Sequence, residues 1–209
     1  MFNCAFGIYK IFKKNCCIRA NRHIHCNKLD NIGHTSSDIV KVLANGIIMD
    51  SVHIKENDNL DLVYEKMSHL GANLLIKTLP SIIEGTNQRI KQDESEVTYA
   101  YNVSREEEKL DFNKTSKEVY NHIRSLYPFP TSYLMLEEKI IKITGAYIGK
   151  TTTSEPGVIT NIYKDGFGIS TKDNEIIITS LKPEGKKEMK ASDYLNGVKK
   201  EEFIGKRVK

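Results

Sequence analysis

Several residue types that anchor or cross-link proteins are scarce in this 209-residue sequence. It contains no tryptophan and only five prolines, and all four cysteines lie early in the chain, at Cys4, Cys16, Cys17 and Cys26. No later cysteine can cross-link a core, so we expect a reducing compartment. The sequence also lacks a run of about 18 apolar residues, and this pattern predicts no membrane-spanning helix.

Acidic residues are missing from the start of the chain. None occurs before Asp30, whereas six basic residues precede it: Lys10, Lys13, Lys14, Arg19, Arg22 and Lys28. The apolar run comes before this basic cluster, which is the reverse of the order in a secretory signal. We therefore interpret residues 1–46 as an atypical leader, either an organellar transit peptide or the product of a frameshift or a misassigned start.

The same leader holds residue types that can ligate metals, namely Cys16, Cys17, His23, His25 and Cys26. Their spacing fits no paired C-x-x-C pattern of a zinc site. We expect an accidental cluster and predict no metal.

The composition, with 39% apolar and 28% charged residues, is typical of a soluble globular protein. The net charge of +4 is unevenly distributed. From Lys139 onward there are 14 Lys or Arg against 9 Asp or Glu, a balance of +5, whereas Met1 to Glu138 has 17 against 18, a balance of −1. This excess of positive charge indicates either a soluble basic tail or a surface that contacts a phosphate backbone.

Helical signals dominate the middle of the chain. Residues 47–54 form short extended runs, and apolar residues then recur at spacings of three and four from Leu60. We predict a helix that begins at an Asp58 or Asn59 cap and ends near Pro80, with a short extension to Gly85 left open. Residues 104–108 are charged, and we expect them to be solvated.

A second, shorter helix is predicted before the prolines at 128 and 130. Thr115 and Glu118 have the spacing of a capping box, and the apolar face of this helix carries Val119, Ile123 and Leu126. The prolines stop the helix and direct the chain into extended structure.

Strand signals follow in quick succession. The predicted strands are 133–136 and 139–148 flanking Glu137-Glu138, 157–163 and 167–170 around an Asp-Gly turn, and 175–181. Five or six short strands with tight turns predict a small closed or nearly closed barrel. A terminal helical turn at 191–196 is expected to end at Gly197 in the left-handed conformation.

Several stretches match one family in the same order. They are Gly71–Pro80, Thr98–Ala100, Asp111-Phe112, Ile123–Pro130, Pro156–Ile159, Leu181–Met189 and Asp193–Gly197. Together they resemble methionyl-tRNA formyltransferase from about Ile47 to the C-terminus. Pro128-Phe129-Pro130 replaces the usual Pro-Trp-Pro of that family.

The resemblance implies an α+β chain with a remnant of a Rossmann-like formyltransferase domain, followed by a C-terminal OB-like β-barrel. The domains would be the leader at 1–46, the end of the catalytic domain at 47–85, a linker at 86–97 and the barrel domain at 98–209. The barrel is expected to help to hold tRNA, in agreement with its positive charge.

The implied activity is transfer of a formyl group from 10-formyltetrahydrofolate to the amino group of methionyl initiator tRNA, without a metal. We expect a cytoplasmic monomer that contacts no membrane, or a matrix protein if the leader is a transit peptide. Two alternatives stay open: a non-catalytic basic RNA-binding module, and a related folate-dependent formyltransferase that acts on a small amine.

The family uses an Asn-x-His pair and a later Asp in catalysis. Asn21-Arg22-His23 has that spacing but is followed by Ile24–Asn27 instead of Ser-Leu-Leu-Pro, and His34 stands where the acid belongs. We therefore assign no catalytic and no folate-binding residue. We expect a catalytic domain that is truncated or altered, and the activity of the isolated chain stays open.

Six basic residues are the candidate tRNA-binding residues: Arg124, Lys139, Lys142, Lys186, Lys187 and Lys190. Arg124 is expected on the solvent side of its helix, as a phosphate or interdomain contact or as a helix-end ion pair. The aromatic rings of Tyr127, Phe129 and Tyr133 could stack on bases, but we expect them to be buried.

Overall fold

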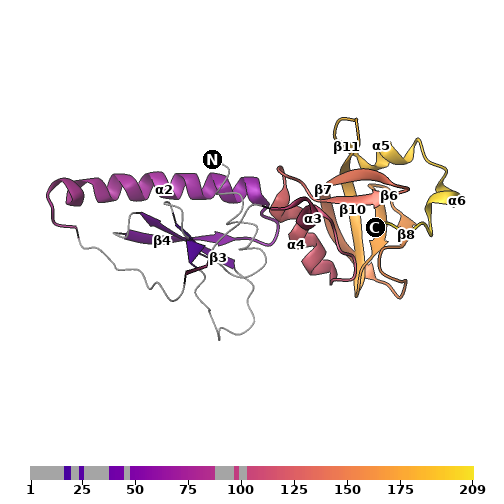
Figure 1. The fold of residues 1–209 in the computed structure, drawn as a ribbon, viewed down its shortest axis with the longest axis horizontal. Helices are drawn as coiled ribbons and strands as arrows, with labels where there is room; N and C mark the ends of the chain where they lie inside the picture. Colours follow the sequence, from indigo (N-terminus) through magenta and orange to yellow (C-terminus); the bar gives the residue numbers. More distant parts are fainter. Residues whose placement is uncertain (1–16, 20–23, 26–37, 45–47, 88–96, 99–102) are drawn as a thin grey trace. The chain divides into compact units, whose positions relative to one another are not determined.

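The computed structural model describes residues 17–19, 24–25, 38–44, 48–87, 97–98 and 103–209. The chain divides into two compact units, Met1–Asn102 and Val103–Lys209, which are coloured along the sequence in Figure 1. The predicted domain boundaries at 46, 85 and 97 are finer than this division and stay predictions.

The first unit contains a five-stranded sheet with the order β4-β3-β1-β2-β5. Its strands are β1 (Cys17–Arg19), β2 (Ile24–His25), β3 (Asp38–Ala44), β4 (Ile48–Ile54) and β5 (Val97–Thr98). The pair β1 and β3 is parallel, whereas β3 and β4 form an antiparallel hairpin. The extended runs predicted within 47–54 therefore make one strand.

Helix α2 (Leu60–Ile83) packs on β4 and β3, as Figure 1 shows. The side chain of Asn59 accepts a hydrogen bond from the Leu62 backbone N–H at 3.0 Å, which confirms the predicted cap. The helix runs three residues past Pro80, because proline removes only its own N–H while its carbonyl still accepts from Glu84 at 2.9 Å. The short extension left open by the sequence is therefore present.

The second unit is built around a six-stranded antiparallel sheet with the order β6-β7-β10-β9-β8, in which β11 pairs with β10. The strands are β6 (Tyr133–Leu136), β7 (Lys139–Thr151), β8 (Ile159–Ile162), β9 (Phe167–Ser170), β10 (Asn174–Pro183) and β11 (Met189–Lys190). Both predicted hairpins and the strand at 175–181 are confirmed. The fold of this unit is therefore a mixed one with an open antiparallel sheet.

The last residues of the chain lie along both edges of this sheet. The backbone of Lys209 exchanges two hydrogen bonds with Met135 of β6, at 2.7 and 2.9 Å. Ile159 of β8 donates to Lys206 at 2.9 Å and accepts from Gly205 at 2.8 Å. This segment supplies partners for backbone groups that an edge strand would otherwise leave unpaired.

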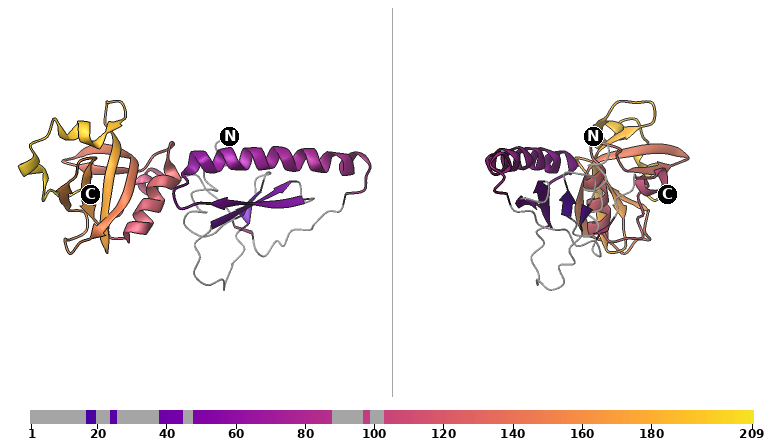
Figure 2. Two further views of the ribbon diagram at one scale, coloured as in Figure 1. Left: turned by 180° about the vertical axis from the view of Figure 1, so that it is seen from behind. Right: turned by 60° about the vertical axis from the view of Figure 1, so that its left-hand side comes forward.

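Four helices complete the second unit: α3 (Arg105–Glu108), α4 (Ser116–Leu126), α5 (Ala191–Leu195) and α6 (Lys200–Phe203). Helix α4 begins with the predicted capping box of Thr115 and Glu118. It packs on β7 and β10, and Figures 1 and 2 show α5 and α6 at the opposite end of this unit.

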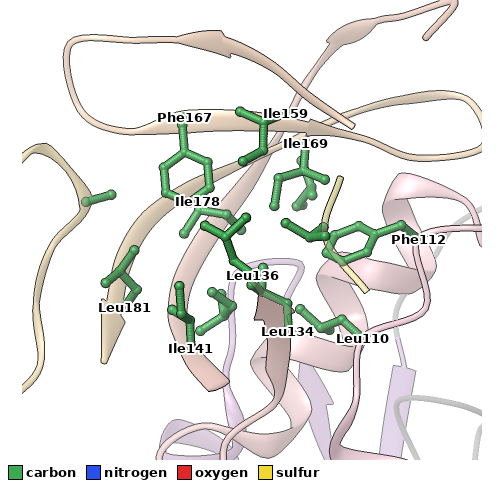
Figure 3. Packing of buried hydrophobic residues seen from close by; sticks show 14 of the residues in the cluster. Leu110, Phe112, Leu134, Leu136, Ile141, Ile159, Phe167, Ile169, Ile178 and Leu181 are labelled. Carbon is green, nitrogen blue, oxygen red and sulfur yellow. The ribbon is translucent and has the colours of Figure 1, made fainter. Parts of the chain in front are cut away.

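The core of the second unit lies between the sheet and these helices. Apolar side chains from distant segments converge there in Figure 3, including Leu110, Phe112, Leu134, Leu136, Ile141, Ile159, Phe167, Ile169, Ile178 and Leu181. Each of these side chains is at most 6% exposed. The predicted buried face of α4, with Val119, Ile123 and Leu126, is also confirmed.

Two local predictions need correction. Residues 104–107 are exposed as expected, but Glu108 is only 9% exposed beside Arg105, and the segment forms helix α3 with a capping box of Ser104 and Glu107. Gly197 is not among the described glycines with positive φ, and α5 instead ends at Asn196 in a right-handed conformation. Asn196 can end the helix in this conformation because its backbone N–H donates to the carbonyls of Asp193 and Tyr194.

None of the helices in the described ranges is both long and apolar enough to cross a membrane.

Candidate nucleic-acid interface

A hollow of about 550 Å³ opens beside the β6–β7 turn, against β11, α5 and α6. We call it the lysine basin and define it by its charged residues and its tyrosine: Glu137, Lys139, Lys186, Asp193, Tyr194, Lys199, Glu202 and Lys206. Its size lies within the range of small-ligand pockets, about 300–1,000 Å³.

Tight turns bring these residues together. Glu137 and Glu138 connect β6 to β7 with φ of 50° and 65°, so the strands reverse within two residues and place Lys139 at the rim. Lys186 follows β10 in a turn closed by its backbone N–H to Pro183 at 3.0 Å. The basin therefore depends on the sheet to join residues that are far apart in sequence.

Ion pairs hold two of the four lysines in the basin. Lys206 pairs with Glu137, and Lys199 pairs with Glu202 at 3.1 Å. The hydrogen bond from Lys206 lowers the pKa of Glu137, and the same bond raises the pKa of Lys206. Both groups are therefore charged at neutral pH.

The other two lysines of the basin, Lys139 and Lys186, are not held by ion pairs to any described residue. Within the part of the chain that the structure describes, the ammonium groups of Lys139 and Lys186 form no ion pair or hydrogen bond, and both side chains are exposed. Lys139 also helps to lower the pKa of the nearby Glu137 carboxylate, but neither ammonium group has to give up an ion pair or hydrogen bond to meet an anionic ligand.

Tyr194 is held by a series of aromatic rings. Its ring centroid lies 6.4 Å from that of Phe203, which in turn lies 5.1 Å from that of Phe167 in edge-to-face geometry. Burial, together with the nearby Glu137 carboxylate, raises the pKa of Tyr194. The hydroxyl therefore stays protonated and can donate a hydrogen bond.

Of the six predicted tRNA-binding residues, the structure brings two into the basin, Lys139 and Lys186. Lys187 and Lys190 are exposed near it but do not line it. The Lys142 ammonium donates to the Pro130 carbonyl at 2.9 Å, so it fixes the loop that carries the two prolines.

The predicted placement of Arg124 on the solvent side of α4 is wrong. Its side chain is only 6% exposed, and its Nε donates to Asn121 at 2.8 Å. The guanidinium also lies 5.8 Å from the ring centroid of Tyr120. The C-terminal turn of α4 is buried on all sides from Ile123 to Leu126, so no solvent side exists there.

The aromatic residues around the prolines differ in their exposure to solvent. Tyr133 is buried as predicted, at 7% exposure, and the Arg105 guanidinium lies 4.3 Å from its ring centroid. Phe129 is 61% exposed, so the expectation that it is buried is wrong. Phe129 lies in a loop that the Thr131 backbone N–H closes by donating to the Leu126 carbonyl at 2.9 Å.

Sequence reasoning missed Tyr194, Lys199 and Lys206 as parts of one site. The only signal was the general excess of basic residues after Lys139, which does not identify which of them converge.

The residues weighed for catalysis, Asn21, Arg22, His23 and His34, lie outside the described residues. So do Cys16 and Cys26 of the cysteine–histidine cluster. Among the residues that are described, no group of three His, Cys, Asp or Glu side chains is arranged to hold a metal ion.

Residues 102–199 match the family described as "Formyl transferase, C-terminal domain". The second unit is therefore the C-terminal domain of a formyltransferase.

The most similar curated relatives include two proteins called methionyl-tRNA formyltransferase. The one from Staphylococcus epidermidis is 42% identical over 180 residues, covering 85% of this chain and 58% of the relative. The one from Bacillus thuringiensis is 42% identical over 176 residues, covering 82% and 56%. These matches confirm the resemblance to methionyl-tRNA formyltransferase, and the chain spans little more than half the length of these relatives.

Two solved structures share the fold. HypX from Aquifex aeolicus superimposes with a TM-score of 0.61 at 13% identity, covering 91% of this chain and 33% of HypX. An N-formyltransferase from Helicobacter canadensis gives a TM-score of 0.52 at 22% identity, covering 83% and 59%. The latter was solved in complex with folinic acid and dTDP-3-aminofucose.

Proposed function

We propose that this chain acts in the formylation of methionyl initiator tRNA, with 10-formyltetrahydrofolate as the donor. The observation that carries this proposal is the 42% identity over 85% of the chain to proteins named for that reaction. The exposed, unpaired Lys139 and Lys186 of the lysine basin support a role for the second unit in holding the tRNA.

The proposal includes the finer domain assignment. The parallel pairing of β1 with β3 beside α2 supports a remnant of a Rossmann-like domain, ending near 85 before a linker at 86–97. The contacts of residues 205–209 with both β6 and β8 support a nearly closed, OB-like barrel at 98–209. Strands β1, β2 and β3 lie within residues 1–46, so we propose that part of the segment first interpreted as a leader belongs to this remnant.

Formyl transfer to an amine requires removal of a proton from the amine, stabilisation of a tetrahedral oxyanion and protonation of the leaving pterin nitrogen. We assign no residue of this chain to these steps. A folate donor is supported by relatives of similar fold that were solved with folinic acid or tetrahydrofolic acid.

For the second unit, the proposed tRNA contacts are Lys139 and Lys186, with Lys187 and Lys190 beside them. Arg124 and Lys142 are proposed to act indirectly, because each is held by contacts within the fold. We further propose a monomer that works in the cytoplasm on initiator methionyl-tRNA.

The test is an assay of formyl-methionyl-tRNA formation with the purified chain, the charged initiator tRNA and 10-formyltetrahydrofolate. We expect product above a control without protein. Binding of the tRNA without turnover would instead favour the non-catalytic RNA-binding module, and neither binding nor turnover would reject both.

The basic residues are tested separately, by tRNA binding at several salt concentrations. The Lys139→Gln and Lys186→Gln variants should each reduce the slope of log affinity against log salt, by about 0.7–0.9 per lost phosphate contact. Lys164→Gln is a matched control, because Lys164 is exposed in the second unit but outside the basin. An unchanged slope in both basin variants would contradict the assignment.

A further inference from the structure

We propose that the lysine basin takes a single unpaired nucleotide of the bound RNA, with its base against Tyr194 and its phosphate between Lys139 and Lys186. This inference rests on the proposed function and gives its RNA-contact site a specific ligand. The shape of the site motivates it, because phosphates of a duplex need only an exposed basic surface, whereas this site is a hollow of about 550 Å³.

The first argument is the aromatic ring. Bases of single strands stack on aromatic side chains, and this contact tolerates any base because every base has a π-face. Tyr194 lines the hollow and is only partly buried. The buried rings of Phe203 and Phe167 support it from the core, so little side-chain freedom is lost when a base binds.

The second argument is the division of charge. Lys199 and Lys206 are engaged with Glu202 and Glu137, whereas Lys139 and Lys186 are exposed and unpaired among the described residues. A phosphate between these two lysines gains charge-assisted hydrogen bonds without breaking an existing ion pair.

The third argument concerns the acidic groups. Asp193 lines the hollow beside Tyr194, and a carboxylate repels phosphate but accepts hydrogen bonds from amino groups of bases or from a ribose hydroxyl. A ligand that carries both a phosphate and hydrogen-bond donors suits a hollow lined by lysines and a carboxylate, and a nucleotide has both.

The experiment compares the 209-residue chain and its variants for binding of a short single-stranded RNA and of the duplex with the same sequence. Tyr194→Leu should bind the single strand about 5- to 150-fold more weakly, with an unchanged salt slope, because stacking releases no counterions. Tyr194→Phe should bind as the wild type does, since it keeps the ring.

The matched control is Tyr147→Leu. Tyr147 is 42% exposed on β7 and does not line the basin, so its loss should leave single-strand binding unchanged. Equal effects of the Tyr194→Leu and Tyr147→Leu variants, or no effect of either, would overturn the inference.

A second measurement does not depend on whether Tyr194→Leu folds. Single-stranded RNA that carries 5-iodouridine is irradiated with the wild-type chain, and the cross-linked peptide is identified by mass spectrometry. We expect the cross-link at Tyr194, and cross-links confined to other residues would overturn the inference. If the wild-type chain binds RNA and the Tyr194 variants bind it equally well, this inference alone is rejected. If the wild-type chain binds no RNA, the RNA contact of the proposed function is rejected as well.

Discussion

At the scale of single residues, Gly166 shows how a neighbouring strand can restrict a turn position to glycine. The sequence places it in an Asp-Gly hairpin turn, where glycine is favoured for its backbone freedom. In the structure, a Cβ at this position would lie 1.8 Å from the backbone carbonyl oxygen of Ile178. The close approach of β10 therefore excludes any side chain.

We expect Gly166→Ala to destabilise the second unit by about 1–3 kcal/mol or more, because the backbone of β10 must move to relieve the clash. Gly197→Ala is the matched control in the same unit, since its Cβ would lie 3.8 Å from the nearest atom. Urea unfolding of both variants measures the difference. Equal stability of the two variants would contradict the argument.

Another residue-scale feature is a buried carboxylate. Glu175 is 1% exposed, and it accepts hydrogen bonds from the Tyr163 hydroxyl and from Asn161 at 3.3 Å. Burial and the Glu175 carboxylate raise the pKa of Tyr163 to about 12. The hydroxyl thus keeps its proton in the folded state at pH values where an unfolded tyrosine has lost it.

Because the folded pKa of Tyr163 is raised, its contribution to stability is complete below about pH 10 and is lost as the pH rises toward about 12. Tyr163→Phe should be less stable than the wild type by about 1–3 kcal/mol at pH 8, because Glu175 loses a donor. The gap should shrink between pH 10 and 12. Urea unfolding across this range tests it, and a gap independent of pH would be evidence against the coupling.

At the scale of elements, the start of α4 combines local and distant caps. The Thr115–Glu118 box is readable in the sequence, but the backbone N–H of Ser116 donates to Asp173 at 2.7 Å. Burial alone would raise the pKa of Asp173, and hydrogen bonds from Ser116, Thr171 and Asn174 outweigh it and lower that pKa. The β9–β10 turn therefore caps the helix.

Asp173→Ala should destabilise the second unit by about 0.5–2 kcal/mol at pH 7, as expected for loss of a helix cap. Since the folded pKa of Asp173 is lowered, its contribution is present above the unfolded value near 3.8 and is lost as the pH falls through the folded value. The difference in unfolding free energy from the wild type should thus be smaller at pH 2.5 than at pH 7. A difference that grows in acid would refute this account.

The β6–β7 turn is a second element-scale feature, because two glutamates occupy positions with positive φ. Glycine adopts this conformation without the steric cost that a Cβ imposes. Glu138→Gly should stabilise the second unit by about 0.4–1 kcal/mol, seen as a rise of a few degrees in melting temperature. Glu137 is unsuitable for this change because it pairs with Lys206. A lower melting temperature would show that the strain argument fails here.

At the scale of the whole molecule, the second unit has its own core and its own sheet, and the chain divides at residue 102. We expect residues 103–209 alone to unfold cooperatively, with a stability of about 5–15 kcal/mol. Calorimetry of the fragment tests this, and an unfolded fragment would show that the first unit is required. The fragment should also retain the salt slope of RNA binding seen with the whole chain.

Much of the second unit was predictable because its signals are local. Glu137-Glu138 and Asp165-Gly166 lie between short β-rich runs, so their hairpins follow from turn length and strand period. The capping box of α4 likewise spans only four residues. The candidate site was predictable only in part, since a count of lysines identifies a basic region but cannot say that Lys139 and Lys186 line one hollow while Arg124 is buried.

The sequence by itself determined the two hairpins of the second unit, the caps of α2 and α4 and, through its motifs, the kinship to methionyl-tRNA formyltransferases, because the residues that specify each of these are close together along the chain. The tertiary structure alone decided the convergence of Glu137, Tyr194 and Lys206 and the capping of α4 by Asp173. The Glu137–Lys206 and Ser116–Asp173 contacts each join residues more than 50 positions apart, and only the tertiary fold brings them within reach.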